Sequence, residues 1–417
     1  MRSFWEIFNM SRKMVFGRYD YAVFGTFIAY AVGSLVVPVA LVQVARDLGF
    51  TLDEGGTSRG GWLHMMRCVS ICATLALSGF MAGRWGNRRP LGVSVALIGA
   101  GLLVCAVSPT YGVLLAALMI AGLGEGVVEA LGTPFTQELH PEEPGRYVNF
   151  SHGFWSVGVL VSTVLFGWLL YMGMNWRLVL VLAAAFAIAP TLLLLAPEGK
   201  KKYPERPERV STGRVLSQAK AICKEPRFWL YFAAMFLAGG GEFCLTFWCA
   251  SFIQMSFAGS VMAGGIGTAI FAAGMLGGRT GFGFWFRQHQ FRGLLLAMGV
   301  LGTVVCVFIP SVAASAWEWK LHLFFVMLFF AGVATAPFWP SLQTQAVARL
   351  PGLDVTMVYV MLSFAGVPGC GFFTLLMGYL ADERVWGMAK SFYIVPACFV
   401  VIMALLLMDR IPKNKLK

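Results

Sequence analysis

Charged residues are scarce in this chain. Only 12% of its 417 residues are charged, whereas about 25% is usual for a soluble domain. The apolar residues make up 58% and run in long blocks such as Ala22–Val44 and Leu178–Leu195. Because a helix needs about 20 apolar residues to cross the hydrocarbon core, we predict an all-α, multi-pass membrane protein in contact with the lipid bilayer.

The sequence also lacks the motifs of an enzyme. It has no phosphate-binding glycine loop followed by Lys and Ser or Thr, no nucleophile elbow and no metal-ligand cluster. Its nine cysteines stand singly, apart from Cys68 and Cys72 one helical turn apart, and none has zinc-site spacing. We therefore predict no enzymatic activity, no catalytic residues, no cofactor, no metal and no disulfide framework. The first apolar block is also too long for a cleavable signal.

Apolar blocks and short connections predict twelve transmembrane helices. Their expected ranges are 22–44, 61–82, 90–108, 111–137, 147–171, 177–196, 228–254, 261–284, 293–311, 321–347, 355–381 and 389–408. The exception among the connections is Pro197–Arg227, which is rich in Lys and Arg and interspersed with Pro and Glu. We expect an N-terminal six-helix bundle over 1–196, a cytoplasmic linker over 197–227 that could carry a short surface helix, and a C-terminal bundle over 228–417.

Basic residues concentrate on one side of the predicted helices. With both termini on the same side, 25 of the 32 Lys and Arg fall there, 6 fall opposite and Arg67 lies inside a helix. Because positive loops stay on the cytoplasmic side, we expect both termini in the cytoplasm and the protein in the inner (plasma) membrane. The same distribution accounts for the net charge of +12, so no nucleic acid partner is predicted.

The two halves of the sequence resemble each other. With an offset of 211 residues, the fifth and eleventh helices match at several positions, among them Gly158 with Gly369 and Thr163 with Thr374. Such internal repeats are typical of alternating-access transporters, which bind their substrate between the halves near the midplane. We therefore predict two pseudo-symmetric six-helix bundles. Separately, we expect the protein to be a monomer.

The connection after the second helix resembles a family motif. Gly79 begins a stretch that continues with Arg84, Gly86 and Arg88, and this is similar to the loop of the major facilitator superfamily, with Gly83 in place of an Asp. The resemblance implies a conformational role for these residues. In the second half only Gly278-Arg279 and Gly281 of the pattern remain.

Further segments resemble the fucose-permease-like sugar:proton symporter branch. The resemblance rests on Glu129 five residues before Pro134, on Asn149 and His152 in the fifth helix, and on Glu242 six residues before Trp248. It implies sugar transport coupled to protons. The branch has a carboxylate in its first helix, whereas Ala22–Val44 has none.

Ionisable residues within predicted helices are candidates for function, because charge inside a bilayer is costly. Glu125 and Glu129 lie one turn apart on one face, where mutual repulsion favours a proton on at least one of them. We predict Glu129 as the proton carrier, assisted by Glu125 or by His152, whose imidazole titrates near physiological pH. The alternatives are a buried ion pair or a structural hydrogen bond.

Other polar and aromatic residues are predicted to contact the solute. Arg67 offers a fork of donors to an anion or pairs with Glu125. Glu242 follows Gly239-Gly240-Gly241, which suggests a bent helix beside a cavity. The predicted substrate-binding residues are Asn149, Arg67, Glu242, Trp248, Gln343 and Trp155, and His64 is a weaker candidate. Pro38, Pro134, Pro337, Pro340 and Pro368 are expected to bend helices.

We interpret the chain as a secondary transporter that moves a small polar, sugar-like solute together with H+, with Na+ as an open alternative. A multidrug transporter, an organic-anion transporter using Arg67, and a non-transporting receptor on the same fold remain alternatives.

Overall fold

The computed structural model describes residues 14–142, 144–197, 212–286 and 288–409. Twelve helical segments in this part are long and apolar enough to cross a membrane. The predicted number and order of spans are confirmed, with ends that differ by a few residues. The seventh span, for example, begins at Pro226 and not at 228.

The spans follow one another in two sets of six. The first set comprises α2 (Arg18–Asp47), α3 (Thr57–Trp85), α4 (Arg88–Ala106), α5 (Tyr111–Leu139), α6 (Pro144–Tyr171), and α7 with α8 (Trp176–Ala185, Ile188–Leu195). The second comprises α10 (Pro226–Ser256), α11 (Val261–Trp285), α12 with α13 (Phe291–Val307, Ile309–Ala314), α14 with α15 (Lys320–Thr335, Phe338–Arg349), α16 (Val355–Leu380), and α17 with α18 (Met388–Ser391, Ile394–Met408). The short helices η1 (Leu52–Glu54), α9 (Thr212–Cys223) and η2 (Gln288–Gln290) lie between spans.

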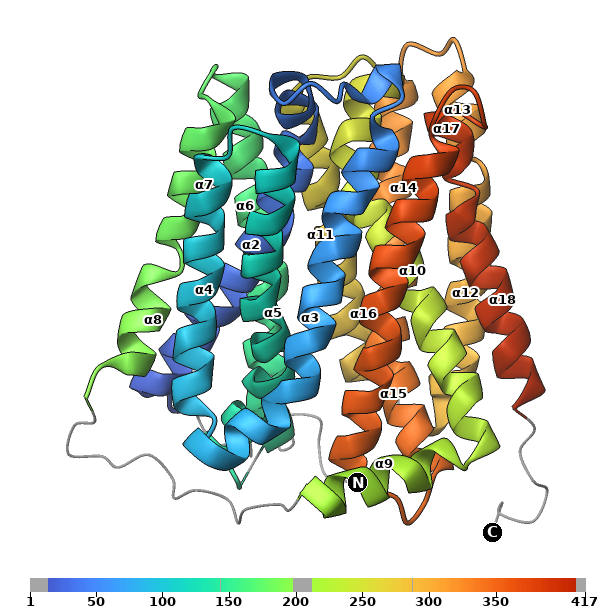
Figure 1. The fold of residues 1–417 in the computed structure, drawn as a ribbon. Coiled ribbons are helices and arrows are strands. Elements are labelled where there is room, and N and C mark those ends of the chain that lie inside the picture. The colour runs from blue at the N-terminus through green and yellow to red at the C-terminus, as the bar shows by residue number, and fades with distance from the viewer. Residues whose placement is uncertain (1–13, 143, 198–211, 287, 410–417) are drawn as a thin grey trace.

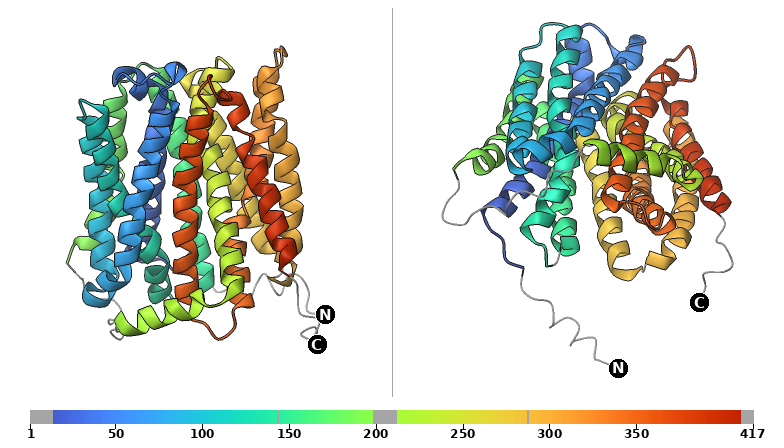
Figure 2. Two further views of the ribbon diagram at one scale, coloured as in Figure 1. Left: turned by 45° about the vertical axis from the view of Figure 1, so that its right-hand side comes forward. Right: turned by 60° about the horizontal axis from the view of Figure 1, so that its bottom comes forward.

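The two sets form two bundles that lie side by side, with α9 across one end (Figures 1 and 2). We call this end, where α10 begins, the linker end, and the opposite end, which carries η1, the far end. The bundles meet where α3 packs along α16 and α6 packs along α11. Much of the expected linker over 197–227 lies outside the described residues, but α9 is the surface helix that it could carry.

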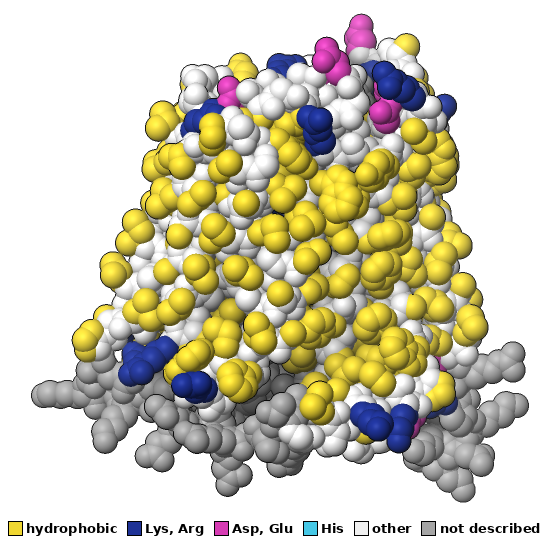
Figure 3. Space-filling view, viewed as in Figure 1, with side chains coloured by type: hydrophobic (Ala, Val, Ile, Leu, Met, Phe, Trp, Pro, Cys, Tyr) yellow, Lys and Arg dark blue, Asp and Glu magenta, His cyan; other side chains and the backbone are white. Residues whose placement is uncertain are grey.

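The outer surface matches a bilayer environment. Hydrophobic side chains cover the middle of the face seen in Figure 3, and Lys, Arg, Asp and Glu gather toward its two ends. Large apolar residues such as Leu178, Leu192 and Val326 are more than half exposed. Because every backbone group of a membrane span must be hydrogen-bonded internally, helices of this length are the structure that such blocks can adopt.

Four spans are interrupted by a turn that separates two helices. Proline lacks an amide donor, and its ring clashes with the carbonyl four residues earlier, so it is tolerated best near the start of a helix. In each interrupted span the second helix has a proline at or just before its first turn: Pro190, Pro310, Pro337 and Pro396.

The five prolines that were expected to bend helices differ in whether they lie at a break between helices. Pro337 lies at the break between α14 and α15, and Pro340 lies three residues further on. Pro38, Pro134 and Pro368 lie inside continuous helices. The breaks at Pro190, Pro310 and Pro396 were not predicted.

The glycine run before Glu242 does not open the helix. α10 is continuous from Pro226 to Ser256. A Cβ on Gly239 would lie 2.4 Å from the carbonyl oxygen of Gly366, and one on Gly240 would lie 2.2 Å from the ring of Phe373. The helix is thus not broken at these glycines, which instead allow α10 and α16 to approach closely.

Candidate functional site

The far end of the interface between the bundles is tightly packed. The indole of Trp248 is fully buried, and a Cβ on Gly60 or Gly378 would lie 3.0 or 3.1 Å from its ring. Nearby, the Trp62 indole donates a hydrogen bond to the Tyr379 hydroxyl at 3.1 Å. Glycines of α3 and α16 thus let the two bundles close around large aromatic rings.

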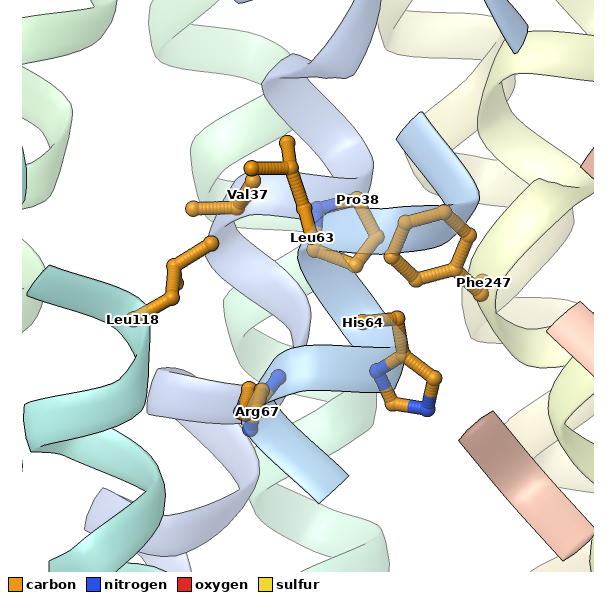
Figure 4. Close-up of a pocket in the computed structure, with 7 residues that line it drawn as sticks. All are labelled: Val37, Pro38, Leu63, His64, Arg67, Leu118 and Phe247. Atoms are coloured by element: carbon orange, nitrogen blue, oxygen red, sulfur yellow. The ribbon is translucent and has the colours of Figure 1, made fainter. Parts of the chain in front are cut away.

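The packing continues toward the midplane around His64. This side chain is buried, and its ring lies 5.1 Å from the ring centroids of both Phe243 and Phe247 in the other bundle. Figure 4 shows His64 and Phe247 at a small void that Arg67 also lines. The void measures about 10 Å³, about the room that one water molecule needs. No solute could pass here in this conformation.

A second group of polar residues lies nearer the linker end, where the interface is less tightly packed. His152 of α6 is exposed, and its Nε2 is 2.7 Å from the Thr133 hydroxyl. Glu129 of α5 is partly buried, and the Tyr30 hydroxyl of α2 lies close to its carboxylate. Because an ionisable side chain is costly to expose to lipid, the exposure of this imidazole favours a water-accessible interface at this depth.

The other bundle contributes Glu242 and Arg279 to this group. One Arg279 amino nitrogen lies 3.4 Å from a Glu242 carboxylate oxygen, and the guanidinium carbon lies 5.7 Å from the ring centroid of Trp155 in α6. The electrostatic interactions of Arg279 extend to Glu129 and His152. We call Glu129, His152, Trp155, Glu242 and Arg279 the central cluster. Its residues come from both bundles.

Arg67 and Glu125 form a buried ion pair that is separate from the central cluster. The Nε of Arg67 donates to Glu125 Oε2 at 2.8 Å, and one amino group donates to Oε1 at 2.5 Å. Two further donors bind the Ser34 carbonyl and hydroxyl at 3.0 and 2.7 Å. Both charged side chains are almost inaccessible, at 3% and 0% exposure. The pair joins three helices of one bundle and leaves no guanidinium nitrogen unpaired for an anion.

The remaining predicted substrate-binding residues lie in different environments. Trp248 is part of the far-end packing and does not reach the central cluster. Gln343 of α15 is partly buried and donates to the Ser363 hydroxyl at 3.4 Å. Trp155 belongs to the central cluster, and the side chain of Asn149 lies outside the described part of the chain.

The predicted conformational loop connects α3 to α4. Gly86 has a φ of +73°, a conformation that favours glycine, and it ends α3. Arg88 is buried and donates to the Tyr19 hydroxyl at 3.2 Å and to the carbonyl after α8. Arg84 is exposed, and a Cβ on Gly79 would meet no other atom within 4 Å. Of these four residues, Arg88 is the one that anchors the loop to the bundle.

Arg279 was not among the predicted site residues. The sequence places it close to the basic segment after the eighth helix, although the expected range 261–284 includes it. Side chains of a helix lean toward its N-terminus, and α11 begins at the far end, so the long Arg279 side chain extends back toward the midplane. The feature of the sequence that could have identified Arg279 as a candidate is an arginine inside an apolar block.

Comparison with known proteins gives the family. The family model described as Major Facilitator Superfamily matches residues 22–319. Polyol transporter 5 of Arabidopsis thaliana is 26% identical over 47% of this chain and 34% of its own length. The chain spans only about a third to two fifths of the length of such curated relatives.

Solved structures show the same fold. A D-xylose-proton symporter aligns with a TM-score of 0.73 and 14% identity, over 95% of this chain and 98% of that one. The Escherichia coli fucose:proton symporter aligns with a TM-score of 0.64 and 16% identity, over 94% and 98%. With two six-helix bundles and a family match over most of its length, this chain is a multi-pass membrane protein and belongs to the major facilitator superfamily.

Proposed function

We propose that this protein is a secondary transporter that carries a small, hydroxylated, sugar-like solute together with a proton across the inner (plasma) membrane. The observation that carries the proposal is the central cluster, in which Glu129 and His152 of one bundle face Glu242 and Arg279 of the other. Ionisable groups at such depth are rarely kept without a function. Distant resemblance to a polyol transporter and to sugar-proton symporters agrees with this cargo.

The orientation proposed is with the linker end in the cytoplasm, since most Lys and Arg lie on that side. The packed far end then faces outward, and the conformation described is one that gives the central cluster access to the cytoplasm. Alternating access requires a second conformation in which α3 and α16 separate at the far end and the linker end closes.

Glu129 is the proposed proton carrier. Its carboxylate is partly accessible and lies close to the neutral hydroxyl of Tyr30, so it can exchange a proton with the open side. Glu125 is inaccessible and bound to Arg67, which fits a structural charge better than a carrier. Closure around a bare carboxylate is opposed by its desolvation, so proton and solute together favour closure.

The test is uptake by proteoliposomes that contain the purified protein. We expect labelled sugar-like solutes to accumulate when the outside is acidic, without a Na+ gradient. Glu129→Gln should abolish accumulation, because the amide cannot release a proton, while exchange of internal for external solute persists. Glu318→Gln alters an exposed carboxylate at the far end and should behave as wild type.

Two results would contradict the proposal. Accumulation by Glu129→Gln at the wild-type level would exclude this residue as the carrier. Uptake that follows a Na+ gradient and ignores pH would replace H+ by Na+.

A further inference from the structure

Two arginines within the membrane spans differ in how far the protein satisfies their hydrogen-bond donors. Every nitrogen of the Arg67 guanidinium donates to Glu125 or Ser34, at 2.5–3.0 Å. The Arg279 guanidinium makes one hydrogen bond, a long one of 3.4 Å to Glu242, among the described residues. Its Nε is buried without any acceptor there. Arg279 therefore has unused capacity to bind an anion.

The surroundings of Arg279 suit a bound solute. Its side chain is 29% exposed, in the part of the interface where His152 is also accessible. The guanidinium stands over the Trp155 ring of one bundle and beside Glu242 of the other. A solute bound here would touch both bundles, which a transported solute must do to influence closure.

We propose that the solute carries a carboxylate and that Arg279 binds it, so that the cargo is a sugar acid or a similar hydroxylated acid. This inference rests on the proposed function and specifies its substrate class. Arginine presents two parallel donors that match a carboxylate, and the Trp155 ring offers an apolar face to the carbon skeleton. The Thr133 hydroxyl and His152 supply partners for hydroxyl groups of the solute.

The carboxylates of the cluster explain why a proton helps such a cargo to bind. Glu242 holds one Arg279 amino group, and Glu129 lies close enough to interact with both. An anionic solute is repelled by two ionised glutamates. A proton taken up on either one weakens that repulsion and makes Arg279 more available, so proton and acid bind together.

The experiment compares pairs of probes that differ by the carboxylate. D-galacturonate and D-glucuronate are matched with D-galactose and D-glucose, and D-gluconate is added as an open-chain acid. Binding to purified wild-type protein is measured by calorimetry, and uptake is measured in proteoliposomes. We expect at least one acid to bind more than about tenfold more tightly than its matched neutral sugar.

Three variants test the role of Arg279. Arg279→Gln should lose the preference for the acid, and Arg279→Lys should retain part of it, because a single charge remains without the fork. Arg46→Gln removes an exposed positive charge at the far end and should leave the preference unchanged. Size-exclusion chromatography in detergent reports whether each variant is folded.

The wild-type comparison alone can overturn the inference. A protein that binds none of the acids, or binds neutral sugars equally well, contradicts it whatever the variants do. So does a folded Arg279→Gln protein with an intact preference. Acid uptake that is unaffected by a pH gradient would instead refute the proton coupling of the proposed function and leave the Arg279 assignment standing.

Discussion

At the scale of single residues, charge inside the membrane is arranged in two contrasting ways. Arg67 and Glu125 satisfy each other within one bundle, whereas Glu242 and Arg279 meet through one long contact between helices that also face the other bundle. A buried pair costs desolvation energy that good geometry can offset, but a single buried charge without its partner is strongly unfavourable. The first pair is therefore suited to stabilising the fold. In the second pair, a ligand could replace Glu242 as the partner of Arg279.

Loss of one member of the Arg67 pair should destabilise the protein. Glu125→Gln leaves a buried guanidinium without its counter-charge, which we expect to cost about 3–5 kcal/mol. Thermal unfolding in detergent measures the effect. The double variant Arg67→Met with Glu125→Leu replaces both charges by apolar groups and should recover most of the loss.

The exposed ion pair of Asp47 and Arg177 at the far end provides the matched control. Asp47→Asn should lower stability by about 1 kcal/mol or less, because water screens the pair. Equal losses for Asp47→Asn and Glu125→Gln would contradict the structural role of the buried pair.

Sequence reasoning located these residues along their helices but did not determine their partners. It placed Glu129, Glu242 and Arg67 inside the membrane, because charge in an apolar block is visible in the sequence. Whether Arg67 binds Glu125 or an anion stayed open, since that depends on the side of each helix that faces its neighbour. The contact of Glu242 with Arg279, 37 residues away, was missed for the same reason.

At the scale of elements, small residues set how closely helices of the two bundles approach. A Cβ on Gly265 of α11 would lie 2.3 Å from the Thr163 carbonyl oxygen of α6. Glycine is common in membrane helices, so the sequence could not distinguish the glycines that contact a neighbour from those that do not. On the same helix, Gly277 has no atom within 4 Å of such a Cβ.

Gly265→Val should therefore oppose closure of the far end. Overpacking of this kind costs about 1–3 kcal/mol, and each 1.4 kcal/mol shifts the equilibrium between open and closed forms by about tenfold. We expect slower transport and faster labelling of Thr57→Cys, a buried far-end position, by a polar maleimide. Gly277→Val should label at the wild-type rate, and faster labelling of both variants would exclude an effect specific to this contact.

At the scale of the whole molecule, the hydropathy pattern predicts the fold because the bilayer permits few alternatives. Twelve apolar blocks became twelve spans, and the internal repeat anticipated two bundles. The pattern says nothing about which end is closed, since a transporter must adopt both conformations at similar free energy. The packing of Trp248 at the far end is a property of one conformation, so its predicted contact with the solute stays a prediction about the other.

Locking the far end should stop transport completely. Trp62 of α3 and Tyr379 of α16 meet at 3.1 Å across the two bundles. In a background with the exposed Cys223 changed to Ser, Trp62→Cys and Tyr379→Cys can be bridged by a bifunctional methanethiosulfonate of the length of the two lost side chains. Uptake should fall to the level of empty liposomes and return when a reductant cleaves the bridge.

Each single-cysteine variant, treated with the same reagent, should keep transporting, because it cannot join the bundles. Full transport by the bridged protein would mean that α3 and α16 need not separate at this end, and that alternating access through this interface is wrong.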